Sequence, residues 1–425
     1  MSLYLTKLLL FLLWVPCIVA APSGIQKRSF KVDRIRNPNF KRHNGPKELL
    51  RSYRKYRMPI PQDLLDALED EPANALLPES PPSHGSKTMK VTEVDAIAQT
   101  TVGLVPAIPA NGGIEYISPI TIGGQTINVA LDTGSADLWV FSSQLPGSAQ
   151  VGHQTYNPLL SPTFRHMPSA NFSIIYGDGT SASGNVGIDV VDVGGATVTN
   201  QAVQMATAVS PVFVLDMNLS GLVGLGFSQL STVKPVKQKT FFENIMPTLF
   251  QPLFTVDLRK DTASAYEFGI IDSSKFRGTL SWIPAYTRKG FWQLSSGGFA
   301  VGSLQKKLPV AQVIIDTGTT LMLVSEELAN GYYSQVPGAK NTLAAGGTTF
   351  PCNTTLPDLL LDISPGYTAR VRGEDINFGA FEGDECFGGI QRTASHFQIW
   401  GDIFFRSQFV VFHGGNHSLG MAPHT

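Results

Sequence analysis

Cysteine is scarce in this chain, and several common catalytic motifs are missing from it. The 425 residues include three cysteines, and Cys17 lies in an N-terminal segment that we expect to be removed. The chain has no Gly-x-Ser-x-Gly turn and no His-Glu-x-x-His helix, which disfavours a nucleophile-elbow hydrolase and a zinc peptidase. His413 and His417 are four residues apart, but the two glycines between them oppose a helix. We therefore interpret them as part of a surface loop and expect no metal site.

Long apolar runs are also missing, apart from one near the N-terminus. Lys7 precedes the apolar run 8–20, and the small pair Ala20-Ala21 follows before a proline. This pattern predicts a secretory signal peptide, residues 1–20; an uncleaved anchor is the alternative. The last residues lack the apolar tail of a lipid-anchor signal. We expect a secreted, extracellular protein without a membrane anchor.

The two parts of the chain carry opposite charge, although the net charge is only −1. Residues 1–99 have 15 basic and 10 acidic side chains, and the remainder has 17 and 23. Residues 27–57 alone have 12 basic and 2 acidic side chains. Such a block indicates nucleic acid, a membrane surface or an acidic partner within the chain. An exported chain without a recognition motif favours the last, so we expect no nucleic-acid partner.

Residues 21–99 differ in composition from the remainder. They become acidic and proline-rich after the basic block, and they have few aromatic or β-branched runs that would build a core. We interpret them as a pro-segment and linker, with Lys27-Arg28 as a weak processing signal and the mature chain starting near Thr100.

The remaining chain is predicted to be rich in strands, because its short apolar segments are separated by Gly, Asn and Pro. Residues 114–122 and 125–131 are joined by Gly-Gly, which predicts a hairpin. Two short helices are expected. One begins after Thr240, which has a glutamate three residues on, and the other after Ser325, which has two acidic residues in the first turn.

One phrase occurs twice. Residues 129–135 read VALDTGS, and residues 313–319 read VIIDTGT, so that Asp316 follows Asp132 by 184 residues. Each copy is an apolar strand that ends in an acid, a hydroxyl residue and a glycine. A carboxylate at the end of a buried strand costs free energy unless it is paired or hydrogen-bonded, so we expect the two acids to meet.

A second phrase also recurs. Leu-Val-Gly at 222–224 and Ile-Trp-Gly at 399–401 place Gly224 and Gly401 92 and 85 residues beyond their acids. A glycine at these positions lets a second strand pass close to the acid-bearing loop. The repeats predict two similar lobes that face one another.

These residues resemble the pepsin-like aspartic proteases, including the secreted fungal type of penicillopepsin and aspergillopepsin. The likeness covers residues 100–425. Its carriers are DTGSADLW at 132–139, YGDG at 176–179, DTGTT at 316–320, the two apolar-apolar-glycine phrases and the Cys352/Cys386 pair. Ile175 and Trp400 depart from the residues common in relatives, outside the chemistry.

The resemblance implies an all-β, bilobal pepsin-like fold with a cleft and a β-hairpin flap, and an aspartic endopeptidase activity. It implies these domains: 1–20 signal peptide, 21–99 pro-segment and linker, 100–273 N-terminal lobe, 274–425 C-terminal lobe. Asp132 and Asp316 would be the catalytic pair. Substrate-binding residues would be Tyr176, Gly177, Asp178, Gly134, Gly318, Thr319, Phe213 and Leu222. Supporting residues would be Thr133, Ser135, Trp139 and Thr317.

In this mechanism two neighbouring carboxylates share one proton in acid. The ionised one takes a proton from water, and the protonated one polarises the substrate carbonyl. No cofactor or metal ion is needed. A catalytically silent peptide-binding or inhibitor protein, and a two-acid glycosidase, are the alternatives.

The pro-segment contains Arg-Lys-Tyr-Arg at 54–57, which resembles the Lys-Tyr element with which family pro-segments block the cleft. We expect Lys55 to lie between Asp132 and Asp316 in a zymogen that matures near Gln99-Thr100 in acid. Asp178, two residues beyond the flap tyrosine, would let Lys be accepted before the cut besides large apolar residues; its alternative role is to stabilise the hairpin turn.

Two cysteines remain after the signal peptide. Cys352 and Cys386 are 34 residues apart and are expected to pair in an oxidising compartment, which would stabilise the fold by about 3–4 kcal/mol. Four Asn-x-Ser/Thr sites are possible glycosylation sites: Asn171, Asn218, Asn353 and Asn416. The expected partners are protein and peptide substrates and the pro-segment of the chain itself, and we expect a monomer.

Overall fold

The computed structural model describes residues 44–69, 102–110, 115–175, 181–260, 262 and 264–425. The chain divides into two compact units, Met1–Phe30 and Lys31–Thr425, and all of the described residues belong to the second. Among the described residues, no helix is both long and apolar enough to cross a membrane.

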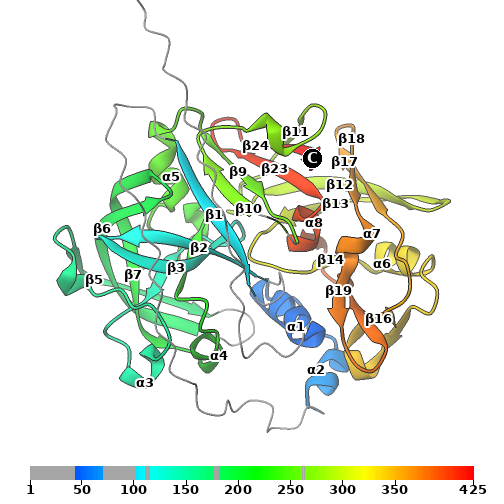
Figure 1. Ribbon diagram of the computed structural model, residues 1–425, viewed down its shortest axis with the longest axis horizontal. Helices are drawn as coiled ribbons and strands as arrows, with labels where there is room; N and C mark the ends of the chain where they lie inside the picture. The colour runs from blue at the N-terminus through cyan, green and yellow to red at the C-terminus, as the bar shows by residue number, and fades with distance from the viewer. Residues whose placement is uncertain (1–43, 70–101, 111–114, 176–180, 261, 263) are drawn as a thin grey trace, which may run out of the picture. The chain divides into compact units, whose positions relative to one another are not determined.

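The largest sheet has 13 strands and includes segments from both ends of the second unit (Figure 1). Its order is β11 (Ser281–Pro284), β24 (Ser418–Pro423), β23 (Gln408–His413), β9 (Leu253–Asp257), β10 (Ser264–Phe268), β1 (Gly103–Ala110), β2 (Glu115–Ile122), β3 (Gln125–Asp132), β8 (Gly221–Gly224), β4 (Leu138–Phe141), β7 (Ala196–Val209), β6 (Ser181–Val193), β5 (Arg165–Ile175). Strands β9 and β10 precede residue 274, yet β9 pairs with β23. Pairing therefore crosses the boundary expected between the lobes.

Two smaller sheets complete the fold. The seven-stranded sheet has the order β18 (Tyr367–Val371), β17 (Leu359–Ser364), β12 (Gln293–Val301), β13 (Leu304–Ile315), β22 (Phe397–Trp400), β14 (Met322–Ser325), β21 (Ile390–Thr393). The four-stranded sheet has the order β15 (Lys340–Thr342), β16 (Gly347–Pro351), β20 (Glu385–Gly388), β19 (Asn377–Ala380).

The predicted repeat is present in the strand pairing. The order β3-β8-β4-β7 in the large sheet matches β13-β22-β14-β21 in the seven-stranded sheet. The directions match too: parallel, antiparallel, then parallel in both. The all-β bilobal expectation is confirmed, and each acid-bearing strand has an equivalent neighbour on either side.

Local sequence signals set the ends of several elements. Gly123 and Gly124 adopt positive φ angles of 53° and 81° between β2 and β3, as a two-residue hairpin turn requires. Thr240 and Glu243 form a capping box on α5 (Phe241–Ile245), and the Ser325 side chain caps α6 (Glu326–Tyr333). The hairpin and both helix starts are confirmed.

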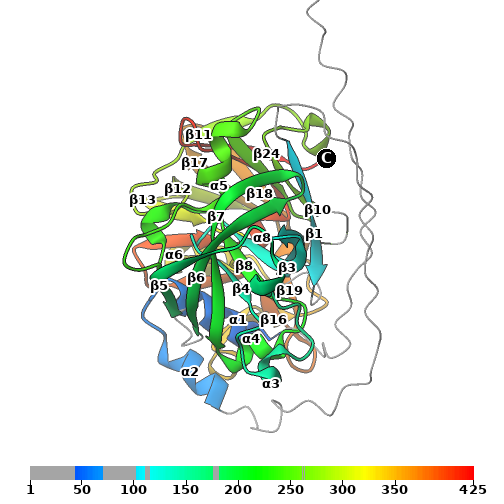
Figure 2. The ribbon, with the colours of Figure 1, turned by 90° about the vertical axis from the view of Figure 1, so that its left-hand side faces the viewer.

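Other helices are short. They are α3 (Gly147–Gln150), α4 (Pro211–Leu215), α7 (Gly373–Ile376) and α8 (Asp402–Phe405), with 3₁₀ turns η2 (Pro158–Leu160), η3 (Ser228–Leu230), η4 (Met246–Thr248), η5 (Ser273–Lys275) and η6 (Leu343–Ala345). Figure 2 shows the long strands β5, β6 and β7 crossing the face turned to the viewer.

The basic segment contains two helices that we did not expect, α1 (Gly45–Lys55) and α2 (Gln62–Glu69). In Figure 1 they are the blue helices, with α1 between the cyan-green strands and the orange strands. Leu49, Tyr53 and Leu64 are buried in a cluster with apolar residues of the C-terminal half, including Leu323 and Phe387. The segment lacks a core of its own because its apolar side chains complete another one.

Candidate active site

Two aspartates lie at the ends of equivalent strands. Asp132 is the last residue of β3, and Asp316 directly follows β13. Their side chains are 1% and 0% exposed. Such burial is costly for a carboxylate unless hydrogen bonds and nearby charges compensate it.

Each carboxylate accepts hydrogen bonds from its own loop. Gly134 N donates to Asp132 Oδ1 over 2.8 Å, and Gly318 N donates to Asp316 Oδ1 over 2.9 Å. The outer oxygens accept from hydroxyls two positions further on than the conserved-looking threonines: Ser135 Oγ to Asp132 Oδ2 over 2.6 Å, and Thr319 Oγ1 to Asp316 Oδ2. The two loops thus hold their acids in the same way.

A reciprocal pair of threonines joins the loops. Thr133 N donates to Thr317 Oγ1 over 3.1 Å, and Thr317 N donates to Thr133 Oγ1 over 3.0 Å. Each hydroxyl in turn donates to a carbonyl oxygen of the opposite strand, of Ile315 and Leu131 respectively. Both threonines are buried, so these bonds fix the distance between the strands that carry the acids.

Glycine is required where the loops cross. A Cβ atom on Gly134 would lie 2.3 Å from Asp316 Oδ1, and one on Gly318 would lie 2.2 Å from Asp132 Oδ1. Each loop backbone therefore touches the acid of the other half. The expected close approach is also found at Gly224, where a Cβ would lie 2.5 Å from backbone atoms of Ala136.

A lysine and a tyrosine from the basic segment contact the acids. Lys55 Nζ, at the end of α1, lies 2.9 Å from Asp132 Oδ1 and 2.9 Å from Asp316 Oδ2. The hydroxyl of Tyr56 donates to Asp316 Oδ2 over 2.7 Å. Sequence analysis named Lys55 for this position but not Tyr56, whose signal was its place directly after that lysine.

The surroundings drive the two carboxyl pKa values apart. Burial raises the pKa of Asp132 to about 6, against the charge of Lys55 and together with that of Asp316. Burial also acts on Asp316, but Lys55 and hydrogen bonds from Asp132, Thr319 and Tyr56 outweigh it and lower that pKa to about 2. For Lys55, burial lowers the pKa, yet both carboxylates more than compensate and the net change is upward. The pair therefore holds one proton over an acidic range.

The expected substrate-binding residues are described in part. Trp139 and Phe213 are buried and pack edge to face, with ring centroids 5.1 Å apart. Leu222 lies on β8, opposite Ala130 of the aspartate strand. Tyr176, Gly177 and Asp178 lie outside the described residues, so their predicted roles stay predictions.

The predicted disulfide is present, between Cys352 and Cys386. It joins the segment after β16 to β20. Of the predicted glycosylation sites, Asn171, Asn353 and Asn416 are exposed and Asn218 is half-buried.

Further contacts attach the basic segment to the C-terminal half. The hydroxyl of Tyr53 donates to the carbonyl oxygen of Arg392 over 2.5 Å. The guanidinium of Arg392 lies 3.0 Å from Asp63 of α2. The sequence gave no signal for these residues, because each is ordinary on its own and gains its role from the pairing.

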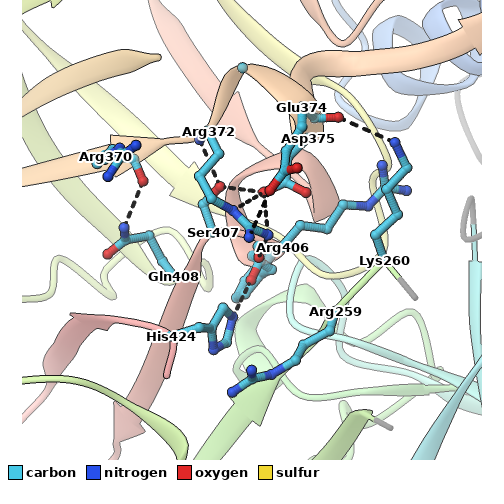
Figure 3. Close-up of polar contacts among 12 residues, drawn as sticks. Arg259, Lys260, Arg370, Arg372, Glu374, Asp375, Arg406, Ser407, Gln408 and His424 are labelled. Carbon is cyan, nitrogen blue, oxygen red and sulfur yellow. Dashed lines mark hydrogen bonds and ion pairs between the residues drawn. The ribbon is translucent and has the colours of Figure 1, made fainter. Parts of the chain in front are cut away.

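A cavity of about 450 Å³ lies apart from this site, and none of its lining residues is a predicted site residue (Figure 3). Several arginines line it, but Arg372 is paired with Asp375 and Glu374, and Arg259 with Asp257. We interpret this network as structural, because carboxylates of the chain itself already neutralise these two guanidinium groups.

Two adjoining buried carboxyl groups with one shared proton can accept a proton at one oxygen and donate one at another. Lys55 blocks this chemistry while it contacts both acids. The constellation is suited to activating a water molecule against a polarised carbonyl, once the lysine has left.

Comparisons with known proteins agree with this geometry. The family model described as eukaryotic aspartyl protease matches residues 115–424. The chain is 42% identical over 418 residues to aspartic protease PEP3 of Coccidioides posadasii, covering 95% of this chain and 92% of that protein. It is 47% identical over 323 residues to penicillopepsin-1 of Penicillium janthinellum (76% and 98%) and 40% identical over 416 residues to endothiapepsin of Cryphonectria parasitica (96% and 93%).

Proposed function

The chain belongs to the eukaryotic aspartyl proteases and is a pepsin-like aspartic endopeptidase, and from this we propose that it is exported as an inactive precursor and hydrolyses proteins in acid. The observation that carries the proposal is the contact of one lysine of the basic segment with two buried aspartates. A cation there neutralises the pair and occupies the position that a water molecule and a substrate carbonyl need.

In the mature enzyme Asp132 and Asp316 perform the reaction. The ionised carboxylate takes a proton from a water molecule held between the acids, and the water oxygen forms a bond to the peptide carbon. The protonated carboxyl donates its proton to the carbonyl oxygen. The C–N bond then breaks, the amine nitrogen takes up a proton, and the dyad returns to its singly protonated state.

Residues around the acids set up this chemistry. Ser135 and Thr319 hold the outer oxygens, Thr133 and Thr317 fix the loops, and the backbone N–H groups at the two glycines stabilise negative charge on the inner oxygens. Tyr176 would close over the substrate from the flap, and Trp139 would hold it there by a hydrogen bond.

Substrate preference is the finer part of the proposal. Phe213 and Leu222 would line an apolar pocket before the cut, which favours Phe and Leu there. Asp178 would pair with a substrate lysine that otherwise would be buried without compensation. Asp178→Thr should therefore lower the Lys-to-Leu ratio of kcat/KM by at least roughly tenfold, about 1.4 kcal/mol. A smaller change would leave Asp178 the role of a turn residue.

Processing and location follow from the same proposal. Residues 1–20 would be removed on export and residues 21–99 near Gln99-Thr100 in acid, leaving lobes 100–273 and 274–425 in a monomeric extracellular enzyme. The exposed Asn171, Asn353 and Asn416 are accessible to glycosylation.

One experiment separates the candidate functions. The purified full-length chain is incubated with a denatured protein near about pH 3–4, with and without pepstatin. We expect proteolysis that pepstatin stops. A silent binding protein would retain the substrate uncut, and a glycosidase would cut an oligosaccharide instead; either result would reject the proposal.

A further inference from the structure

One histidine of the N-terminal half faces two carbonyl oxygens with its two ring nitrogens. His153 Nδ1 lies 2.9 Å from the oxygen of Leu219, and Nε2 lies 3.0 Å from the oxygen of Val214. The ring stacks on Phe141 with centroids 4.1 Å apart. The imidazole is therefore held in place by its face as well as by both nitrogens.

Two carbonyl partners determine the number of protons on the ring. A carbonyl oxygen only accepts hydrogen bonds, and a neutral imidazole has one N–H and one lone pair. A neutral ring would direct its lone pair at one of the two oxygens, which is repulsive. Only the imidazolium, with an N–H on each nitrogen, satisfies both contacts. His413 shows the other arrangement, because its Nδ1 accepts from the N–H of Asn416.

The segment that His153 contacts lies between the aspartate strand and the flap hairpin. We call residues 210–219 the wall segment. At its start, Ser210 N donates to the oxygen of Ser181, the first residue of β6, over 2.9 Å. At its end, Ser220 N donates to the oxygen of Asn128 on β3 over 2.8 Å. The wall segment contains α4, and the Phe213 side chain packs on Trp139.

His153 joins the two ends of this segment. Val214 belongs to α4, and Leu219 comes just before β8. Figures 1 and 2 both show α4 beside α3, the helix that precedes His153. Neighbours of His153 reinforce the contact, since Gln154 N donates to Ser220 Oγ over 3.0 Å. The backbone of the wall segment is thus fastened from one side chain.

We propose that His153 is a positioning residue whose imidazolium clamps the wall segment in acid, and so shapes the apolar pocket at Phe213. This inference rests on the proposed function for its effect on substrate binding. Imidazole changes its charge within about pH 5–8, so the clamp is complete in the acidic range where the aspartates share a proton and incomplete near neutrality.

Other titratable groups around the ring are few. Strand β4 and helix α3, which lie against His153, contain no ionisable side chain. The wall segment contributes Asp216. Burial, followed by the charge of Asp216, raises the pKa of the neighbouring Glu115 well above its usual value, and Arg51 opposes this change. The test must therefore separate His153 from the Asp216 and Glu115 carboxyl groups.

Amide hydrogen exchange tests the clamp without any activity. The full-length chain with Asp132→Asn, which should not process itself, is compared at about pH 5 and about pH 7.5, after correction for intrinsic exchange. We expect amides of Phe213 and Leu219 to be about tenfold better protected at the lower pH, and His153→Gln to remove this difference. The exposed His166→Gln is the control and should behave as the parent chain.

Kinetics tests the effect on the pocket. With peptides that carry Phe or Ala before the cut, His153→Gln should raise KM for the Phe peptide about tenfold and leave kcat and the Ala peptide nearly unchanged. His153→Phe, which can still stack on Phe141 but donates no hydrogen bond, should show the same loss.

Three outcomes would overturn the clamp: no pH-dependent protection in the parent chain, the same pH dependence in His153→Gln, or equal KM changes for both peptides. If the wild-type enzyme cut nothing, the proposed function would fail, while the exchange result would still decide whether the clamp exists.

Discussion

Asp132 and Asp316 accept equivalent hydrogen bonds, yet their pKa values differ in the precursor, because Lys55 and Tyr56 approach Asp316 with two more donor contacts than Asp132 receives. The duplicated phrase in the sequence was sufficient to predict which acids meet. The asymmetry was not predictable, since it depends on where the tip of α1 lies between them.

Replacing either acid should remove activity and keep the fold. Asp132→Asn and Asp316→Asn retain the size of the side chain but cannot exchange a proton, so we expect kcat/KM to fall by about 10³-fold or more. Proteolysis assays and circular dichroism would measure both properties. The exposed Asp384→Asn is the matched control, and substantial turnover by either active-site variant would contradict the mechanism.

The threonines between the loops should matter for stability as well as for rate. Thr133→Val leaves the buried N–H of Thr317 without its acceptor, which should lower the free energy of unfolding by about 1–3 kcal/mol. Thermal unfolding would show it as a lower Tm. Thr126→Val changes an exposed threonine on the same strand and should have little effect; equal shifts would mean that the reciprocal bonds are unimportant.

Helix α1 shows why an element can be missed although its residues are visible. Leu49 and Tyr53 are four residues apart, and both face the C-terminal half. Their composition alone suggested a linker, because the apolar surface that they need belongs to strands more than 250 residues later. Charge gave the better signal, since the basic block predicted an acidic partner within the chain.

The Lys55 contact should make maturation depend on pH. The pKa of Asp316 is lowered to about 2 in the precursor, below an ordinary aspartate value of about 3.9. A lowered carboxyl pKa means that this contact stabilises the precursor above about pH 4 and loses its contribution as the pH falls toward 2. We expect the precursor to persist at neutral pH and to convert quickly in acid, as followed by gel electrophoresis.

Lys55→Gln removes the charge from this contact. The variant should release its basic segment and convert at a higher pH than the parent precursor. Lys47→Gln removes a charge from the exposed first turn of α1 and serves as control. Conversion of the parent at the same rate in neutral and acidic buffer would refute the role of Lys55.

Across the whole molecule, strand pairing mixes the two halves more than the linear domain boundary suggests. The internal repeat predicted the matching sets of four strands, because its phrases mark β3, β8, β13 and β22. It did not predict that β9 and β10 join strands from the chain's end, since their partners are not encoded in any local pattern.

The disulfide is a test of stability that is separate from catalysis. Replacing Cys352 and Cys386 together by serine should lower the free energy of unfolding by about 3–4 kcal/mol, because a 34-residue separation is no longer closed in the unfolded chain. Urea unfolding would measure the change. Activity of the folded variant should remain near that of the parent; a loss of activity without a loss of stability would give the bridge a different role.

The crossing of Gly134 and Gly318 has a consequence for how such a site can arise. Each loop backbone touches the acid of the other half, and each threonine donates to the other strand. Neither half therefore has a finished site of its own, and an ancestral half-length chain would have needed a second copy of itself to make one. Tandem fusion of two such copies would then have freed each half to diverge, as Ser135 and Thr319 have done at matching positions.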